Sequence, residues 1–101
     1  MKTAKYLNEH NVIELLKNQL TLQHLANQEN LGEGLRYIIS VQTQSLSAIA
    51  QRSGINVEQV EAELRDEVAA GVQDIDKGMD KYFGNVNRRT GMTRAQFNRA
   101  L

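Results

Sequence analysis

Apolar residues recur at steps of three and four from residue 57 to residue 82, and this run constrains the fold more than any other feature. Its members are Val57, Val60, Leu64, Val68, Val72, Ile75, Met79 and Tyr82. Such spacing lines up apolar side chains along one face of an α-helix. The chain has no Pro to interrupt a helix. We therefore expect one long amphipathic helix over about 57–83, about 40 Å long, with Gly84 as its C-cap.

Within this helix we expect four side chains to be buried, namely Leu64, Val68, Val72 and Ile75. Gly71 and Gly78 flank the apolar face, and each costs about 1 kcal/mol relative to Ala inside a helix. Close approach of another helix would explain them. The alternatives are a hinge, or a surface on which a partner packs.

Shorter segments are also typical of helices, and none is typical of a strand. Their ranges are 11–30, 35–52 and 93–101. Asn11 is the expected N-cap of the first, and a short helical turn is expected before it at Ala4–Leu7. The second is either one helix or two that meet near Ser45. Thr93 and Gln96 form a capping box for the last.

These elements predict an all-α fold, a small bundle of about four helices in one domain spanning 1–101. Residues 84–101 are expected to form a basic C-terminal loop and short helix. Aromatic residues make up only 5% of the chain, so the core must be aliphatic. The chain has no Cys, and no apolar run has the length of a signal peptide or membrane span. We expect a cytoplasmic protein that does not enter membranes.

Residues 45–64, "SLSAIAQRSGINVEQVEAEL", have the spacing of a helical corner. Counting from Leu46, a small residue stands fifth (Ala50), glycine ninth (Gly54) and a branched aliphatic fifteenth (Val60). Ala allows the two helices to touch, Gly takes the left-handed turn, and Val packs the second helix onto the first. The stretch resembles the helix-turn-helix superfamily, whose second helix lies in the major groove of DNA.

The second helix of this corner carries the wrong charge for DNA. One Arg, Arg65, stands among five acids: Glu58, Glu61, Glu63, Asp66 and Glu67. DNA affinity comes largely from Lys and Arg that neutralise phosphates. Asn56 and Gln59 could contact bases, but they have no cationic support. We therefore interpret the corner as a packing element that does not read DNA.

Charge is segregated along the chain although the net charge is zero. Residues 58–80 hold eight acids and two basic residues, whereas residues 81–101 hold five basic residues and no acid. Three interpretations fit this pattern. The basic tail folds back on the acidic helix, or the acidic helix binds a basic protein or mimics nucleic acid, or the tail binds nucleic acid or an acidic protein.

Residues suited to catalysis or metal binding do not form a known pattern. His10 and His24 are fourteen apart without Cys nearby, which is not a zinc spacing. A calcium loop that starts at Asp74 would need Gly and Glu where Met79 and Asn85 stand. We expect no enzyme, no cofactor and no metal.

The sequence thus favours a small non-enzymatic interaction protein, an adaptor, chaperone or inhibitor, in the style of phage or mobile-element proteins. The expected binding surface for a protein partner consists of Glu58, Glu61, Glu63, Asp66 and Asp74. The alternative is a helix-turn-helix DNA-binding regulator that contacts phosphates through a basic tail. The tail residues are Arg88, Arg89, Arg94 and Arg99. We expect a homodimer, because one short domain cannot easily cover so long an apolar stripe.

Overall fold

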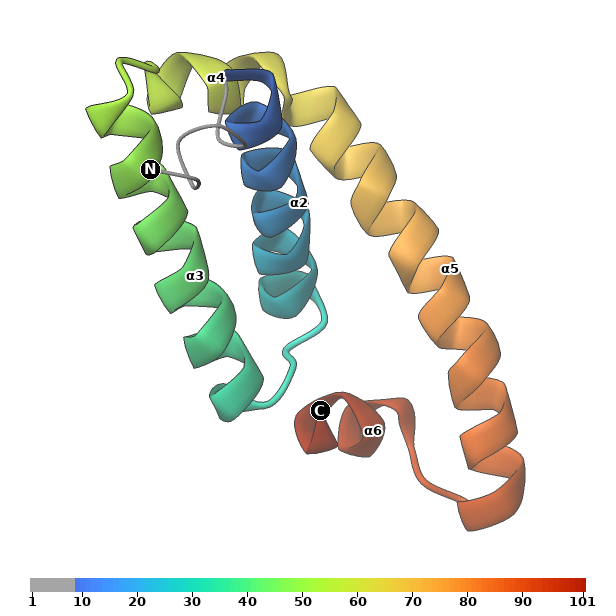
Figure 1. Ribbon diagram of the computed structural model, residues 1–101. Coiled ribbons are helices and arrows are strands. Elements are labelled where there is room, and N and C mark those ends of the chain that lie inside the picture. The colour runs from blue at the N-terminus through green and yellow to red at the C-terminus, as the bar shows by residue number, and fades with distance from the viewer. Residues whose placement is uncertain (1–8) are drawn as a thin grey trace.

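The computed structural model describes residues 9–101, which form five helices and no strand (Figure 1). In chain order they are α2 (Glu9–Gln28), α3 (Glu33–Arg52), α4 (Val57–Glu63), α5 (Arg65–Thr90) and α6 (Arg94–Ala100). The predicted all-α class is confirmed, with five described helices in place of about four. The turn expected at Ala4–Leu7 lies outside the described residues.

Helix α2 is the centre of the fold, since both α3 and α5 pack against it. Its residues Val12, Leu16 and Leu20 follow one another at steps of four and therefore share one face. Val12 and Leu16 are completely buried. The buried apolar cluster around them comprises Val12, Leu16, Leu20, Leu25, Ala50, Ile55, Val57, Val68 and Val72. This cluster is entirely aliphatic, as the composition predicts, but one aromatic residue, Phe97 of α6, is also buried outside it.

Helices α3 and α4 meet in the expected corner. Gly54 has a φ of +82°, so the predicted left-handed turn is confirmed. Ala50 is completely buried and Ile55 nearly so, which fixes the corner to the core. Asn56 begins α4, and its side chain accepts a hydrogen bond from the backbone N–H of Gln59. Helix α3 runs without interruption, so the alternative of two helices that meet near Ser45 is excluded.

The single helix predicted over 57–83 is wrong, because the chain bends at Leu64. Leu64 has φ −89° and ψ 0° and separates α4 from α5. The backbone hydrogen bonds continue across the bend, from Leu64 N–H to the Val60 carbonyl and from Val68 N–H to the Leu64 carbonyl. The bend lets Val57 and Val68, which belong to different helices, both reach the core around α2. Neither Pro nor Gly marks the bend. The apolar residues on both sides keep their spacing of three and four, so the sequence gives no sign of it.

The end of the long helix is also later than predicted. Helix α5 continues through Gly84 to Thr90, and the left-handed residue that ends it is Gly91, with φ +70°. The segment predicted to be a basic loop is therefore the last two turns of α5. The capping box of Thr93 and Gln96 at the start of α6 is confirmed. Asn11 lies inside α2 and is not its N-cap.

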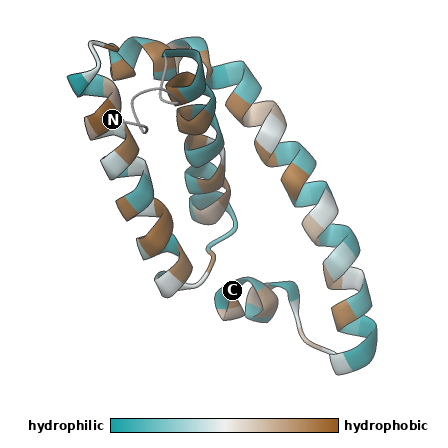
Figure 2. Ribbon diagram, viewed as in Figure 1, coloured by the Kyte–Doolittle hydropathy of each residue, from teal (hydrophilic) through white to brown (hydrophobic). Residues whose placement is uncertain are grey.

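Burial along α5 decreases toward its second half. Val68 and Val72 are buried as predicted, but Leu64 is only half-buried and Ile75 is 37% exposed. Figure 1 shows the reason: α5 diverges from α2 and continues past its end. Hydrophobic residues recur along α5 beyond that point (Figure 2). The second half of the apolar stripe therefore has little cover from the helices that pack on the first half.

Because Val68 is buried and Ile75 is partly exposed, the same substitution by Asp should lower the free energy of unfolding by different amounts at the two positions. Val68→Asp places an uncompensated carboxylate in the core, and we expect it to lower the free energy of unfolding by about 3 kcal/mol or more. The matched variant Ile75→Asp should lower it by about 1 kcal/mol or less, because Asp there reaches water. Urea denaturation of the two variants at low protein concentration measures both. Equal losses would contradict the burial gradient along α5.

The left-handed turn at Gly54 predicts that replacing this glycine by Ala destabilises the protein, whereas the same change at Gly84 does not. Gly54→Ala forces a Cβ into a positive-φ backbone and should cost about 1–2 kcal/mol. Gly84→Ala, inside α5 with no atom within 4 Å of the added Cβ, should stabilise by up to about 1 kcal/mol. Thermal denaturation distinguishes them. A Gly54→Ala variant as stable as the wild type would show that the corner does not need this conformation.

Candidate functional site

The acidic residues singled out in the sequence lie along α4 and the first half of α5. Glu58, Glu61 and Glu63 belong to α4, and Asp66 and Asp74 to α5. All five side chains are exposed. Within residues 9–101, no Lys, Arg or His forms an ion pair with any of them. These five residues, called the acidic surface below, therefore present their charge to solvent.

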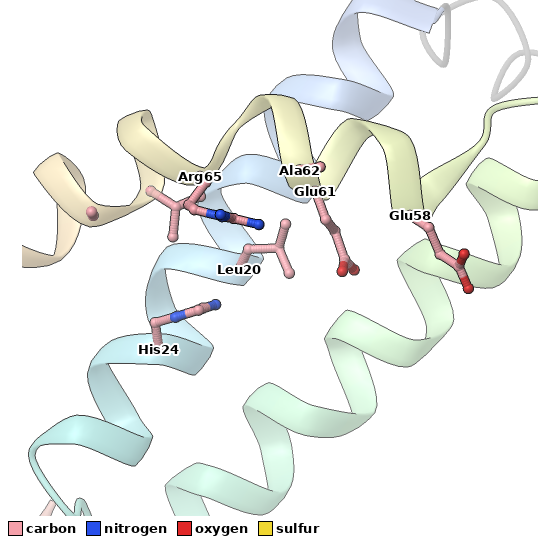
Figure 3. Close-up of a pocket in the computed structure, with 8 residues that line it drawn as sticks. Leu20, His24, Glu58, Glu61, Ala62 and Arg65 are labelled. Atoms are coloured by element: carbon pink, nitrogen blue, oxygen red, sulfur yellow. The ribbon is translucent and has the colours of Figure 1, made fainter.

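A pocket of about 360 Å³ adjoins the acidic surface where α2, α4 and α5 meet (Figure 3). It is lined by Leu20, His24, Glu58, Glu61, Ala62, Arg65, Val68 and Ala69. Glu58 and Glu61 are three residues apart on α4 and therefore share a face of the helix. Figure 3 shows Glu61 and His24 extending from α4 and α2 toward the same opening.

The pocket combines a hydrophobic floor with an acidic rim. Leu20 and Val68 are buried and supply the floor. Glu58 and Glu61 supply two negative charges, against which Arg65 supplies one positive charge. A Lys or Arg side chain has the matching form, since its aliphatic stem packs on apolar surface while its charged end stays near carboxylates.

The basic tail residues do not form one surface. Arg88 and Arg89 lie in the last turn of α5 and Arg99 lies near the end of α6, and all three are exposed. They belong to the end of the molecule opposite α4, along a longest dimension of 49 Å (Figure 1). Arg94, by contrast, is half-buried in an ion-pair cluster.

Arg94 holds α6 against α5 through several charged contacts. Its Nη2 lies 3.1 Å from Asp76 Oδ1 and 3.6 Å from Glu29 Oε2, and its Nη1 pairs with Asp80. The guanidinium carbon also lies 5.7 Å from the centre of the Phe83 ring, a cation–π contact. Charge-assisted bonds of this kind are about twice as strong as neutral ones.

Asn98 completes the attachment of α6 and is itself buried. Its Nδ2 donates to the backbone oxygen of Glu29 at 2.9 Å and to Glu29 Oε2 at 3.2 Å. Its backbone oxygen accepts from Gly32 N–H at 3.0 Å, and its Oδ1 accepts from Arg94 Nε at 3.0 Å. Neither Glu29 nor Asn98 belongs to a local motif, so no sequence pattern indicates their role. Only the fold brings residues 69 positions apart together.

The carboxyl group of Glu29 lies against that of Asp76, and this proximity raises the pKa of Glu29 above its ordinary value of 4.5. The largest cause is a hydrogen bond between the two carboxyls, followed by burial and by the negative charge of Asp76. Arg94 and Asn98 act in the opposite direction. Glu29 therefore keeps its proton to a higher pH than an isolated glutamate does.

Other kinds of site find no support in the described part of the chain. Over residues 9–101, no group of three or more His, Asp or Glu side chains is arranged to hold a metal ion. No helix in that range is long and apolar enough to cross a bilayer. His24 is exposed at the rim of the pocket, and His10 is exposed in the first turns of α2.

Comparison with known proteins found no match for this chain among protein-family models, curated proteins or solved structures.

The raised pKa of Glu29 predicts how stability changes with pH. The folded protein holds this proton more tightly than the unfolded chain does. The resulting stabilisation is therefore complete below the unfolded pKa and is lost as pH rises through the higher folded pKa. Glu29→Gln keeps an acceptor for Asn98 and removes the charge that repels Asp76. We expect the melting temperature of this variant, relative to the wild type, to increase from pH 4 to pH 7.

Thermal melts at matched pH values measure this difference. Glu33→Gln, at an exposed acid without an ion pair among the described residues, is the control and should show a nearly flat difference. A Glu29→Gln difference that is flat or falls with pH would show that the pKa of Glu29 is not raised in the folded protein.

Proposed function

We propose that this chain is a small, non-enzymatic, cytoplasmic interaction protein that binds a basic protein segment through its acidic surface. The observation that carries the proposal is the exposure of Glu58, Glu61, Glu63, Asp66 and Asp74 without any cationic partner in residues 9–101. A concentration of like charge repels itself and contributes nothing to folding. Its benefit lies in attracting and orienting a molecule of opposite charge.

Internal pairing with the basic tail explains only part of the charge segregation. Of the four tail arginines, Arg94 alone forms ion pairs with acids, and its partners are Glu29, Asp76 and Asp80. None of these three belongs to the acidic surface. The internal pairing that the sequence left open therefore leaves the acidic surface available.

The pocket beside the acidic surface narrows the chemistry of the partner. A Lys or Arg on the partner would place its charge near Glu58 and Glu61 and its methylenes on Leu20 and Val68. An apolar residue beside it would cover Ala62 and Ala69, which also line the pocket. We therefore propose a partner segment that alternates basic and apolar residues. An adaptor or inhibitor of a nucleic-acid-binding protein would meet such a segment.

The second candidate is a DNA-binding regulator, and the geometry of the α3–α4 corner is the observation that favours it. Gly54 has the left-handed turn of a helix-turn-helix, and Arg88, Arg89 and Arg99 are exposed. However, α4 would bring Glu58, Glu61 and Glu63 to the phosphates, and repulsion would weaken binding.

Two matched pairs of substitutions separate the candidates. The first double variant, Glu58→Gln with Glu61→Gln, neutralises the rim of the pocket. The control double variant, Glu9→Gln with Glu33→Gln, removes the same amount of charge from other exposed positions. The probe is a short peptide of alternating lysine and leucine. We expect rim neutralisation to weaken its binding about tenfold, equivalent to about 1.4 kcal/mol, and the control pair to change it far less.

The affinity is measured by titration followed by NMR shifts, which should locate binding at residues 58–69 and His24. Arg88→Gln with Arg89→Gln should leave peptide binding intact. A duplex DNA probe tests the second candidate. The proposed function is wrong if the protein binds DNA with an affinity that rises on rim neutralisation and falls in the Arg88→Gln, Arg89→Gln variant. The tail would then be the binding surface.

A further inference from the structure

An apolar groove of about 770 Å³ separates α3 from the second half of α5, with α6 at one end. Its two long walls include Leu35, Ile38, Ile75, Gly78, Met79 and Tyr82. Ile38 is 53% exposed and Tyr82 is 61% exposed, so large apolar side chains face solvent here. This groove is separate from the pocket beside the acidic surface, and the two share no lining residue.

Within residues 9–101, the fold is open and leaves this groove uncovered. Its radius of gyration is 15.9 Å, whereas a compact domain of this length has about 13 Å. Figure 1 shows α5 diverging from α2 toward its C-terminal end. The apolar stripe of α5 continues into this open part.

Among the described residues, no charged side chain lines the groove, but the two helices that form its long walls differ in charge. Helix α3 has no charged residue from 37 to 51. Helix α5 instead has two halves of opposite sign. Residues 65–76 hold four acids and one Arg, whereas residues 77–90 hold four basic residues and one acid. Their balances are −3 and +3, and the sign changes beside Gly78, at the midpoint of the helix.

Two antiparallel copies of such a helix complement each other. The acidic half of each lies along the basic half of the other, and the crossing point falls at the midpoint. A parallel arrangement would place like charges together. Charge complementarity therefore selects a second copy of α5, in antiparallel orientation, as an occupant of this groove.

Gly78 provides the space that such a crossing needs. A Cβ at Gly71 would meet the Thr21 side chain at 3.0 Å, so close packing of α2 explains that glycine. A Cβ at Gly78 would meet nothing within 4 Å. The packing of the protomer itself thus does not require glycine at 78, although glycine weakens a helix.

We propose that the groove is a homodimer interface in which the α5 helices of two copies cross antiparallel near Gly78. The twofold axis passes close to Gly78, and Ile75 and Tyr82 of each copy face the other copy across it. Ile38 and Leu35 of α3 complete the contact. This interface leaves Glu58, Glu61 and Glu63 of α4 exposed, so each dimer carries two copies of the α4 part of the acidic surface.

Sedimentation at micromolar concentrations tests the association. We expect a dimer that Ile38→Asp or Tyr82→Asp weakens at least tenfold, since each introduces a carboxylate into the contact. The controls are Leu15→Asp and Tyr37→Asp, which add the same charge at exposed apolar positions that do not line the groove. All four positions are at least 45% exposed, so the protomers should stay folded.

Single cysteines test the orientation, because the chain has no Cys of its own. Gly78→Cys places two thiols beside the twofold axis, where a disulfide can form. Gly84→Cys places them about 18 Å apart, from six residues of rise on each side. Under mild oxidation, we expect a crosslinked dimer from Gly78→Cys and none above the monomer background from Gly84→Cys.

The outcomes that overturn the proposal are distinct. A monomer at all concentrations would exclude a second copy and leave the groove to a different apolar partner. A dimer that resists Ile38→Asp and Tyr82→Asp would place the interface elsewhere. A dimer that Gly84→Cys crosslinks better than Gly78→Cys would exclude the crossing at Gly78. None of these results depends on the peptide binding tested above.

Discussion

The burial of Val12 and Leu16 on one face of α2 is the contact on which the rest of the structure depends. The α3–α4 corner and the first half of α5 both pack against α2, through Ala50 and Ile55 on one side and Val68 and Val72 on the other. Since α3 and α5 each pack mainly on α2, a groove remains between them near the end of α2. The open groove is thus a consequence of a twenty-residue central helix beside a twenty-six-residue neighbour.

The features that depend on local sequence could be predicted. The helical class, the turn at Gly54 and the capping box at Thr93 each follow from residues within a few positions of one another. The bend at Leu64 could not, because the apolar spacing stays in phase through it and only the packing on α2 produces it. The continuation of α5 through Gly84 was missed because a glycine lowers helix stability without ending a helix.

The candidate site also has one part that local sequence predicts and another that depends on how the helices pack. Glu58 and Glu61, both members of the acidic surface expected from the sequence, are three positions apart in α4, and helical spacing puts them on one face. The pocket beside them needs Leu20 from α2, more than thirty positions away, and no sequence pattern indicates that contact. The same limit applies to Arg94. It was grouped with the other tail arginines by charge alone, yet its contacts with Glu29 and Asp76 depend on where α6 docks.

The attachment of α6 has a consequence for the order in which the chain becomes structured. A helix of seven residues has no stability in isolation, because the cost of nucleation exceeds what so few hydrogen bonds return. Its anchor, Asn98, bonds to Glu29 across 69 positions of sequence, so the contact forms only after α2 and α5 are in place. The last turns of the protein therefore behave as a separate cooperative unit, which opens before the core does and exchanges its amide hydrogens sooner. Because Phe97 belongs both to that unit and to the end of the groove, opening of α6 changes the shape of the apolar surface without unfolding the protein.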